Sequence, residues 1–286
     1  MISRKDLCAI LLIPALFFFA GQSAWAEKFP ERIVSLSPVA TEELFLLDRG
    51  DLLVGRTRFC TKPPEALKKE EVGNVLEVSV EKILALRPDL VLAGSMTDPK
   101  AKEKLKQLDI RVEEFPAADD FNGVCESFLR LGRMIDRGKE AEAMVKTARG
   151  KVEALRSRIP AGERPTVFFQ VGVDPLVTMT GGSFLNDLIE FAGGVNVARD
   201  ARSRIYSRER VIADDPDIII VSGMGFVGEK ENEKEKKVWQ GYRDLKAAKN
   251  HTIYVVESDL YCAPTPLSFV NALQNMIRLL HPHDPA

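Results

Sequence analysis

The sequence has 286 residues, of which 45% are hydrophobic and 29% are charged, and its formal net charge at pH 7 is −2. This composition excludes a disordered chain, which is poorer in apolar residues and more one-sided in charge. It also excludes a disulfide-rich scaffold, since there are only 4 cysteines. We predict no nucleic-acid partner, because such binding requires clustered basic residues.

The N-terminus has the pattern of a secretory signal peptide. Arg4 and Lys5 form a positive start, residues 7–20 are almost wholly apolar, and Ala24 and Ala26 are the small residues that a signal peptidase recognises. A membrane anchor is the alternative, but the apolar run is shorter than the roughly 20 residues that span a bilayer. We therefore predict export to the periplasm, with cleavage after Ala26.

The first half of the remaining chain begins with a strand and a helix and continues with a helix and a strand. The apolar run at 32–36 predicts a buried strand, and 41–47 predicts the helix that follows it. Ser79 has the position of a helix N-cap, and Pro88 is expected to end that short helix. The branched apolar run at 90–93 is typical of a parallel strand that is buried on both faces.

A helical stretch over 121–159 separates the two halves. Val124, Phe128 and Leu131 keep the spacing of one helix face, and Gly138 is expected to divide the stretch into two helices. Because a helix of about 20 residues spans some 30 Å, this pattern predicts a rigid connector and not a flexible tether.

The second half repeats the pattern of the first. Residues 207–221 match 79–93 at an offset of 128 positions, with Ser, Glu, Ala, Pro and Asp in common. The predicted strand at 166–171 and helix at 184–191 correspond to the start of the first half. A further strand and a last helix are predicted at 252–256 and 265–280.

The sequence therefore predicts an α/β fold with two three-layer lobes, whose central sheets are mainly parallel. A long rigid α-helix is expected to join the lobes. The expected parts are a signal peptide, an N-terminal lobe, a linking helical segment and a C-terminal lobe, at 1–26, 27–120, 121–159 and 160–286. The charged run 229–237 is expected to be solvated.

Motifs of enzymes and of metal sites are missing. The chain contains neither a Gly-x-Ser-x-Gly nucleophile elbow nor a phosphate loop. Its 3 histidines, all late in the sequence, cannot easily build a transition-metal site. We predict no metal site and no resident cofactor. For Cys60 and Cys262 three possibilities stay open: a disulfide between them, metal ligation, or thiols that do neither.

Several stretches together resemble one family. Residues 32–43, 54–66 and 79–92, with the signal peptide and the duplicated Ser-x-Glu blocks, resemble the periplasmic solute-binding proteins of ABC importers for cobalamin, haem and iron–siderophores. The resemblance implies two lobes joined by a long helix, with the ligand in the cleft. It also implies that Glu81 and Glu209, one on each lobe, dock on the ABC permease dimer in the inner membrane.

Ligands on open α/β sheets bind at loops that follow the carboxyl ends of strands. The resemblance implies that Phe59 packs on a flat ligand, although Val75 stands where cobalamin binders have a tryptophan. Arg56, Arg58 and Arg204 are candidates to bind the carboxylates of an anionic chelate. The full set of expected ligand-binding residues is Ser37, Pro38, Arg58, Phe59, Cys60, Met96, Gln170, Asp174, Arg204, Tyr206, Met224, Phe226 and Tyr261.

The predicted function is capture of a metal–organic chelate and its delivery to the permease, by a monomer and without catalysis. The chelate would be a cobamide, a haem or a ferric siderophore, and so a cobalt- or iron-containing organic complex. Two alternatives stay open on the same fold. One is an exported thiol-dependent enzyme that uses Cys60 or Cys262, and the other is a sensory ectodomain that acts with a membrane receptor.

Overall fold

The computed structural model describes residues 29–74, 77–159, 162, 164–223 and 228–282. The expected signal peptide and its cleavage point therefore lie outside the described residues, as do Val75, Met224 and Phe226. Within the described part, no helix is both long enough and apolar enough to cross a membrane.

The N-terminal lobe contains a fully parallel sheet of five strands, in the order β3-β2-β1-β4-β5. The strands are β1 (Ile33–Ser35), β2 (Leu53–Arg56), β3 (Glu70–Glu71), β4 (Leu90–Gly94) and β5 (Val112–Phe115). The helices are α1 (Pro38–Leu46), α2 (Val80–Ala85) and α3 (Pro99–Gln107), with short 3-10 helices at Gly50–Leu52 and Pro64–Lys68. The two central strands, β1 and β4, are almost wholly buried, as their branched apolar runs predict.

The connector consists of α4 (Phe121–Met134) and α5 (Gly138–Arg156). The prediction that Gly138 breaks the helix is wrong by two residues, because Gly138 is the first residue of α5. The chain turns at Asp136, whose φ of 58° is left-handed and cannot continue a right-handed helix. Helix α5 has 19 residues and is therefore about 28 Å long.

The C-terminal lobe contains a mainly parallel sheet in the order β10-β9-β6-β7, with β8 also pairing with β6. Strand β7 pairs with β6 in the antiparallel sense. The strands are β6 (Thr166–Gly172), β7 (Val177–Thr178), β8 (Val195–Asn196), β9 (Ile218–Val221) and β10 (Ile253–Val255). The helices are α6 (Phe184–Phe191), α7 (Arg208–Asp214), α8 (Glu229–Gly241), α9 (Lys246–Lys249), α10 (Ser258–Cys262) and α11 (Pro266–Leu280).

The internal repeat of the sequence is also a repeat of backbone structure. The hydroxyls of Ser79 and Ser207 each accept a hydrogen bond, 3.2 Å long, from the backbone N–H three residues later. The repeat also holds at the helix ends, where Arg87 and Asp215 have left-handed φ values of 47° and 44°. Helix α2 therefore ends before Pro88, because the left-handed residue already stops it.

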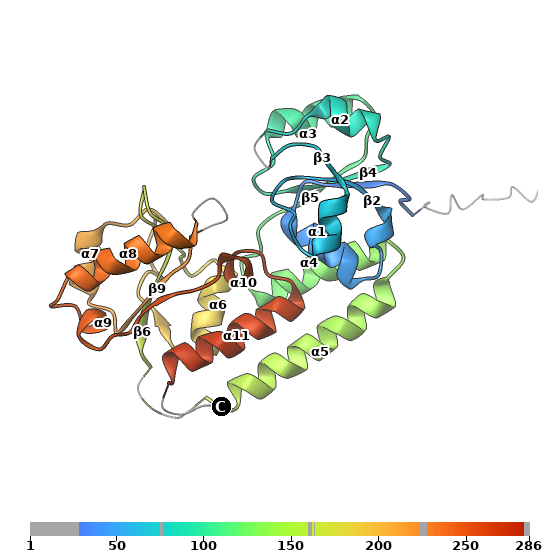
Figure 1. Cartoon of the computed structure of the whole chain (residues 1–286). Helices are drawn as coiled ribbons and strands as arrows, with labels where there is room; N and C mark the ends of the chain where they lie inside the picture. The colour runs from blue at the N-terminus through green and yellow to red at the C-terminus, as the bar shows by residue number, and fades with distance from the viewer. Residues whose placement is uncertain (1–28, 75–76, 160–161, 163, 224–227, 283–286) are drawn as a thin grey trace, which may run out of the picture.

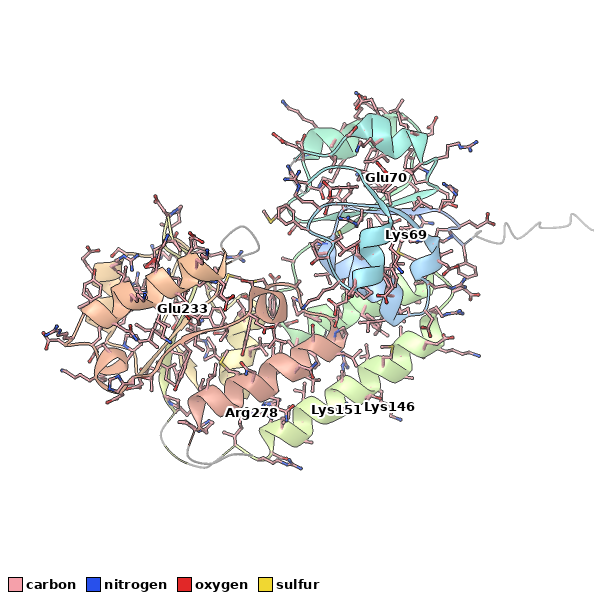
Figure 2. The ribbon with its side chains drawn as sticks, in the orientation of Figure 1. Lys69, Glu70, Lys146, Lys151, Glu233 and Arg278 are labelled. Carbon is pink, nitrogen blue, oxygen red and sulfur yellow. The ribbon has the colours of Figure 1, made fainter. Side chains whose placement is uncertain are left out.

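One hydrophobic core runs through both lobes and the connector. Helices α5 and α11 lie side by side beneath the two lobes (Figure 1). The rings of Phe121 on α4 and Phe269 on α11 stack with their centroids 4.3 Å apart. The backbone N–H of Phe121 also donates to the Asp187 carboxylate of α6, at 2.9 Å. Charged side chains such as Lys146 and Arg278 are on the exposed outer sides of these helices (Figure 2).

The charged run 229–237 is less solvated than its composition suggests. It lies in α8, whose buried residues are Asn232, Glu235 and Trp239. These three follow the i, i+3, i+7 spacing of one helix face, and Glu235 forms an ion pair with Arg208 of α7. The expectation that the run is wholly solvated is therefore wrong for this face.

A pair of glycine substitutions tests how tightly the connector is packed. A Cβ atom added at Gly132 would lie 2.5 Å from the Cβ atom of Ala141 and 3.0 Å from the carbonyl oxygen of Arg137, whereas one at Gly150 meets nothing within 4 Å. We expect Gly132→Ala to lower the free energy of unfolding by about 1–3 kcal/mol. Gly150→Ala is the matched control, and it should raise that energy by roughly 0.5–1 kcal/mol.

The measurement is urea unfolding followed by circular dichroism. Equal effects of the two substitutions would contradict the close approach of α4 and α5.

Candidate ligand-binding site

A cavity of about 420 Å³ lies between the two lobes, and its lining is mainly apolar. The N-terminal lobe supplies Leu36, Ser37, Pro38, Val39, Ala40, Glu43, Phe59, Thr61, Gly94, Ser95, Met96, Phe115, Pro116, Ala117 and Ala118. The connector supplies Val124 and Ser127, and the C-terminal lobe supplies Phe184, Ser258, Cys262, Ala263 and Pro264. Both lobes and the connector therefore contribute to one site.

The topology of the N-terminal sheet explains this lining. Strands β1, β2, β4 and β5 are parallel, so their carboxyl ends meet at one edge of the sheet. The lining residues of this lobe lie in the segments after those four ends and on α1, as expected for an open α/β sheet. Ser37 is the N-cap of α1 and accepts from the backbone N–H of Ala40, and Pro38 occupies the first helical position.

Four of the expected ligand-binding residues line the cavity together, namely Ser37, Pro38, Phe59 and Met96. Ser37 and Pro38 follow β1, Phe59 follows β2, and Met96 follows β4. The side chain of Met96 is 45% exposed, and Phe59 is half-buried. The structure therefore brings an aromatic ring and a thioether to the same cavity, while their contact with a ligand stays a prediction.

Cys60 and Gln170 do not line the cavity, because both are buried with partners inside their own lobes. The thiol of Cys60 lies 3.2 Å from the hydroxyl of Thr57. The side chain of Gln170 accepts a hydrogen bond of 2.6 Å from the indole N–H of Trp239 and donates to the carbonyl of Gly172. Cys60 therefore contacts its own loop after β2, and Gln170 contacts the core of the C-terminal lobe.

Tyr206 and Tyr261 are also core residues. The hydroxyl of Tyr206 donates to Asp214 at 2.6 Å, and that of Tyr261 lies 2.6 Å from the side-chain oxygen of Asn275. Burial and the acceptor Asp214 raise the pKa of Tyr206 to about 12, and burial likewise raises the pKa of Tyr261. Their rings pack in the C-terminal lobe, so the expectation that they face the cleft is wrong.

The expected arginines lie outside the cavity lining. Arg56 is buried, and its guanidinium donates to the carbonyls of Ala66 and Thr57. Arg58 is largely exposed and pairs with Glu71 at 3.6 Å. Arg204 is exposed, as is Asp174, another expected ligand-binding residue. The described lining contains no lysine, arginine or histidine, so it offers no cation to an anionic chelate.

The cysteines form no disulfide within the described residues. Cys262 lines the cavity, and its sulfur lies 3.9 Å from the hydroxyl of Ser222. Cys60 is fully buried, which places its thiol out of reach of a substrate. No group of three or more His, Cys, Asp or Glu residues in the described ranges could hold a metal ion.

Glu43 is a lining residue that the sequence analysis missed. Its side chain, on α1, is only 1% exposed, and neither carboxyl oxygen has a hydrogen-bond partner among the residues that the structure describes. Burial, and to a smaller degree the charge of Glu42, raises the pKa of Glu43 well above its ordinary value of 4.5. The signal was available in the pattern, since Ala40, Leu44 and Leu47 place Glu43 on the apolar face of the helix.

Glu81 and Glu209 occupy equivalent positions in the first turns of α2 and α7. Both side chains are exposed, and the two helices lie in different lobes, away from α5 (Figure 1). In each case a hydrogen bond from the residue's own backbone N–H lowers the pKa of the carboxyl group. Lys104 contributes to this effect at Glu81, with a 3.9 Å ion pair. Both groups are therefore solvent-facing anions.

A model of the periplasmic binding protein family matches residues 33–260, which include both sheets and most of the cavity lining. The chain belongs to this family. As a periplasmic binding protein, it has the two-lobe architecture that the sequence predicts, with a cavity between the lobes.

Relatives of this periplasmic binding protein include ABC-transporter components. It is 30% identical over 271 residues to an uncharacterized ABC transporter substrate-binding lipoprotein of Bacillus subtilis, covering 92% of this chain and 84% of that one. It is 28% identical over 264 residues to a vitamin B12-binding protein of Vibrio cholerae, covering 91% and 93% of the two chains. These relatives are binding proteins and not enzymes.

Solved structures agree with this assignment. The Vibrio cholerae vitamin B12-binding protein aligns with a TM-score of 0.73 and 26% identity, covering 88% of this chain and 96% of that one. A haem-binding protein of Pseudomonas aeruginosa has a TM-score of 0.74 at 21% identity, covering 89% and 94%. At that identity the second match shows the fold alone.

The buried carboxyl of Glu43 predicts a pH dependence of stability. Because its pKa in the folded protein is raised, the associated stability is complete below about pH 4.5 and is lost as the pH rises toward the folded-state pKa. The loss is about 1.4 kcal/mol per pH unit in that interval. We therefore expect the wild type to lose unfolding free energy relative to Glu43→Gln between pH 5 and pH 7, as measured by urea unfolding.

Glu42→Gln is the control, since it makes the same side-chain change at the neighbouring position of α1. Parallel pH profiles for the wild type and Glu43→Gln would contradict a carboxyl group that is buried without a partner.

Proposed function

We propose that this periplasmic binding protein captures a metal–organic chelate in the cavity between its lobes and delivers it to an ABC permease. The chelate belongs to the cobamide, haem or ferric-siderophore class. The protein acts in the periplasm as a monomer, after cleavage of its signal peptide following Ala26. The observation that carries the proposal is the cavity itself, which is apolar and is built from both lobes and the connector.

The character of the lining supports a large and flat ligand. Phe59, Met96, Phe115 and Phe184 present aromatic or thioether groups to one space, and hydroxyls such as that of Ser127 provide a few polar contacts. Sites for small molecules typically combine an apolar wall with a few polar groups that fix orientation. Burial of apolar ligand surface contributes about 25 cal/mol per Å² before the costs of association are subtracted.

The relatives support the ligand class. Vitamin B12-binding proteins of Vibrio cholerae match along nearly the whole chain, and a possible iron-binding protein of Staphylococcus epidermidis has a TM-score of 0.76 at 25% identity. The absence of a cation from the described lining weighs against recognition of the chelate through its carboxylates.

Delivery requires recognition of the permease, and Glu81 and Glu209 are suited to it. They are equivalent positions of the repeat, one on each lobe, and both are exposed anions. Two acids held at a fixed separation by rigid lobes complement two basic groups on a permease with two-fold symmetry. Complementary charge of this kind fixes orientation and accelerates association.

Ligand binding is tested by thermal unfolding with cyanocobalamin, haemin and ferrichrome. A ligand at 100 times its Kd stabilises the folded state by about 2.7 kcal/mol, which corresponds to a rise in Tm of roughly 5 °C or more. We expect Phe59→Ala to weaken binding of the stabilising chelate about tenfold, because the ring loses its contact with the ligand.

Phe29→Ala removes the same ring from a position outside the cavity lining and should leave binding unchanged. Stabilisation by none of the three chelates would contradict the proposed function.

Docking is tested in cells with the double variant Glu81→Gln and Glu209→Gln. We expect it to lose most uptake of the chelate while binding the chelate with unchanged affinity, because both side chains lie outside the cavity. The control is the double variant Glu140→Gln and Glu229→Gln, which removes two exposed acids from the first turns of α5 and α8. Equal uptake by the two double variants would argue against docking through Glu81 and Glu209.

A further inference from the structure

Two acidic side chains are buried among the described residues, Glu43 and Glu235. Glu235, also buried, forms an ion pair with Arg208, whereas both carboxyl oxygens of Glu43 have no hydrogen-bond partner. Glu43 also lines the inter-lobe cavity. A buried polar group without a partner is destabilising, and here it lines the space in which a ligand is proposed to bind.

The groups around Glu43 leave its carboxyl without a counter-charge. Within the described lining, α4 contributes Val124 and Ser127, and the C-terminal lobe contributes the thiol of Cys262 as the other titratable group. Glu42 on the same helix adds a negative charge. None of these groups is a cation.

Four basic residues on or next to elements packed against α1 are engaged elsewhere, and a fifth, Arg133 of α4, is exposed. Arg49 and Arg130 form ion pairs with acidic side chains. Arg137 donates to a carbonyl at the end of α1, and Arg56 of β2 donates to carbonyls of its own lobe. Burial without a counter-charge therefore raises the pKa of Glu43 and favours its neutral, protonated form.

We propose that the neutral carboxyl of Glu43 binds a carboxamide group on the edge of the bound chelate. A protonated carboxyl has one O–H donor and a carbonyl acceptor. A primary carboxamide presents the complementary acceptor and donor, so the two groups satisfy each other through paired hydrogen bonds. This inference rests on the proposed function and narrows it to a chelate that carries amide substituents, as cobamides do.

Other ligand groups fit this position less well. A carboxylate, such as those carried by haem, would enter an apolar space whose described lining offers no cation, and burial of such an anion is costly. A cationic group would first require Glu43 to lose its proton. A carboxamide needs neither a second charge nor a proton transfer, and it supplies the hydrogen-bond partners that the Glu43 carboxyl lacks among the described residues.

The test compares two corrin probes that share a ring system, cobinamide with carboxamides and cobyrinic acid with carboxylates. Their affinities for the purified protein are measured by isothermal titration calorimetry at pH 7. Glu43→Gln keeps a neutral donor and acceptor, so it should bind cobinamide within about threefold of the wild type. Glu43→Leu removes both groups and should bind it about tenfold more weakly. Glu42→Gln is the matched control and should behave as the wild type.

Two results would support the inference: the ordering of the variants just given, and a wild-type preference for cobinamide over cobyrinic acid. Raising the pH from 5 to 9 should also weaken cobinamide binding to the wild type more than to Glu43→Gln, because ionisation removes the O–H donor. Circular dichroism of each variant checks that it folds.

Three results would overturn the inference while leaving the proposed function in place. They are wild-type affinity in Glu43→Leu, equal weakening in Glu43→Gln and Glu43→Leu, and binding of haemin or cobyrinic acid in preference to cobinamide. Equal weakening would indicate an ionised carboxylate that pairs with a cationic ligand group. Failure of the wild type to bind any chelate would overturn the proposed function and the inference together.

Discussion

The packing of α4 and α5 against α11 fixes the positions of the two lobes, and the cavity depends on it. These helices carry one continuous hydrophobic core from the first sheet to the second. The stack of Phe121 on Phe269 and the hydrogen bond from Phe121 to Asp187 tie the start of the connector to the C-terminal lobe. A Gly/Ser tether would leave the lobes free to separate, whereas here a separation would expose the shared core to water.

This constraint determines how the protein can capture a ligand. Most of the lining comes from the N-terminal lobe and the connector, and the C-terminal lobe adds Phe184, Ser258 and residues 262–264. Since the lobes share a core, binding energy is not consumed in ordering a disordered hinge, and a preorganised site loses less entropy on association. The same rigidity holds Glu81 and Glu209 at a constant separation, which the proposed docking of these two acids on a permease requires.

The sequence predicts the elements whose signals are local, and it predicts less well the partners of individual side chains. The caps Ser79 and Ser207 and the buried strands at 90–93 and 218–221 depend on nearby residues, and the structure confirms them. The antiparallel strand β7, with two residues, has too short a pattern to be recognised. The family resemblance correctly predicts the two-lobe arrangement, which no single local pattern contains.

Side-chain roles in the site were harder to predict for a physical reason. Polar residues after the carboxyl ends of strands are suited both to a ligand and to an internal partner, and residue type alone does not distinguish these uses. Gln170 accepts a hydrogen bond from Trp239, and Tyr206 donates one to Asp214. Pro38 and Phe59 line the cavity because they follow the carboxyl ends of two parallel strands, β1 and β2, which lie at the same edge of the sheet.

Glu43 shows the opposite case, in which an acid lies on a helix face that should be apolar. A leucine at this position would complete the core and remove the cost of burying a carboxyl group. Natural proteins depart from such local rules mainly at functional sites. Under the proposed recognition of an amide, the cost of burying the unsatisfied oxygens of Glu43 is offset when the polar edge of the ligand forms hydrogen bonds with them.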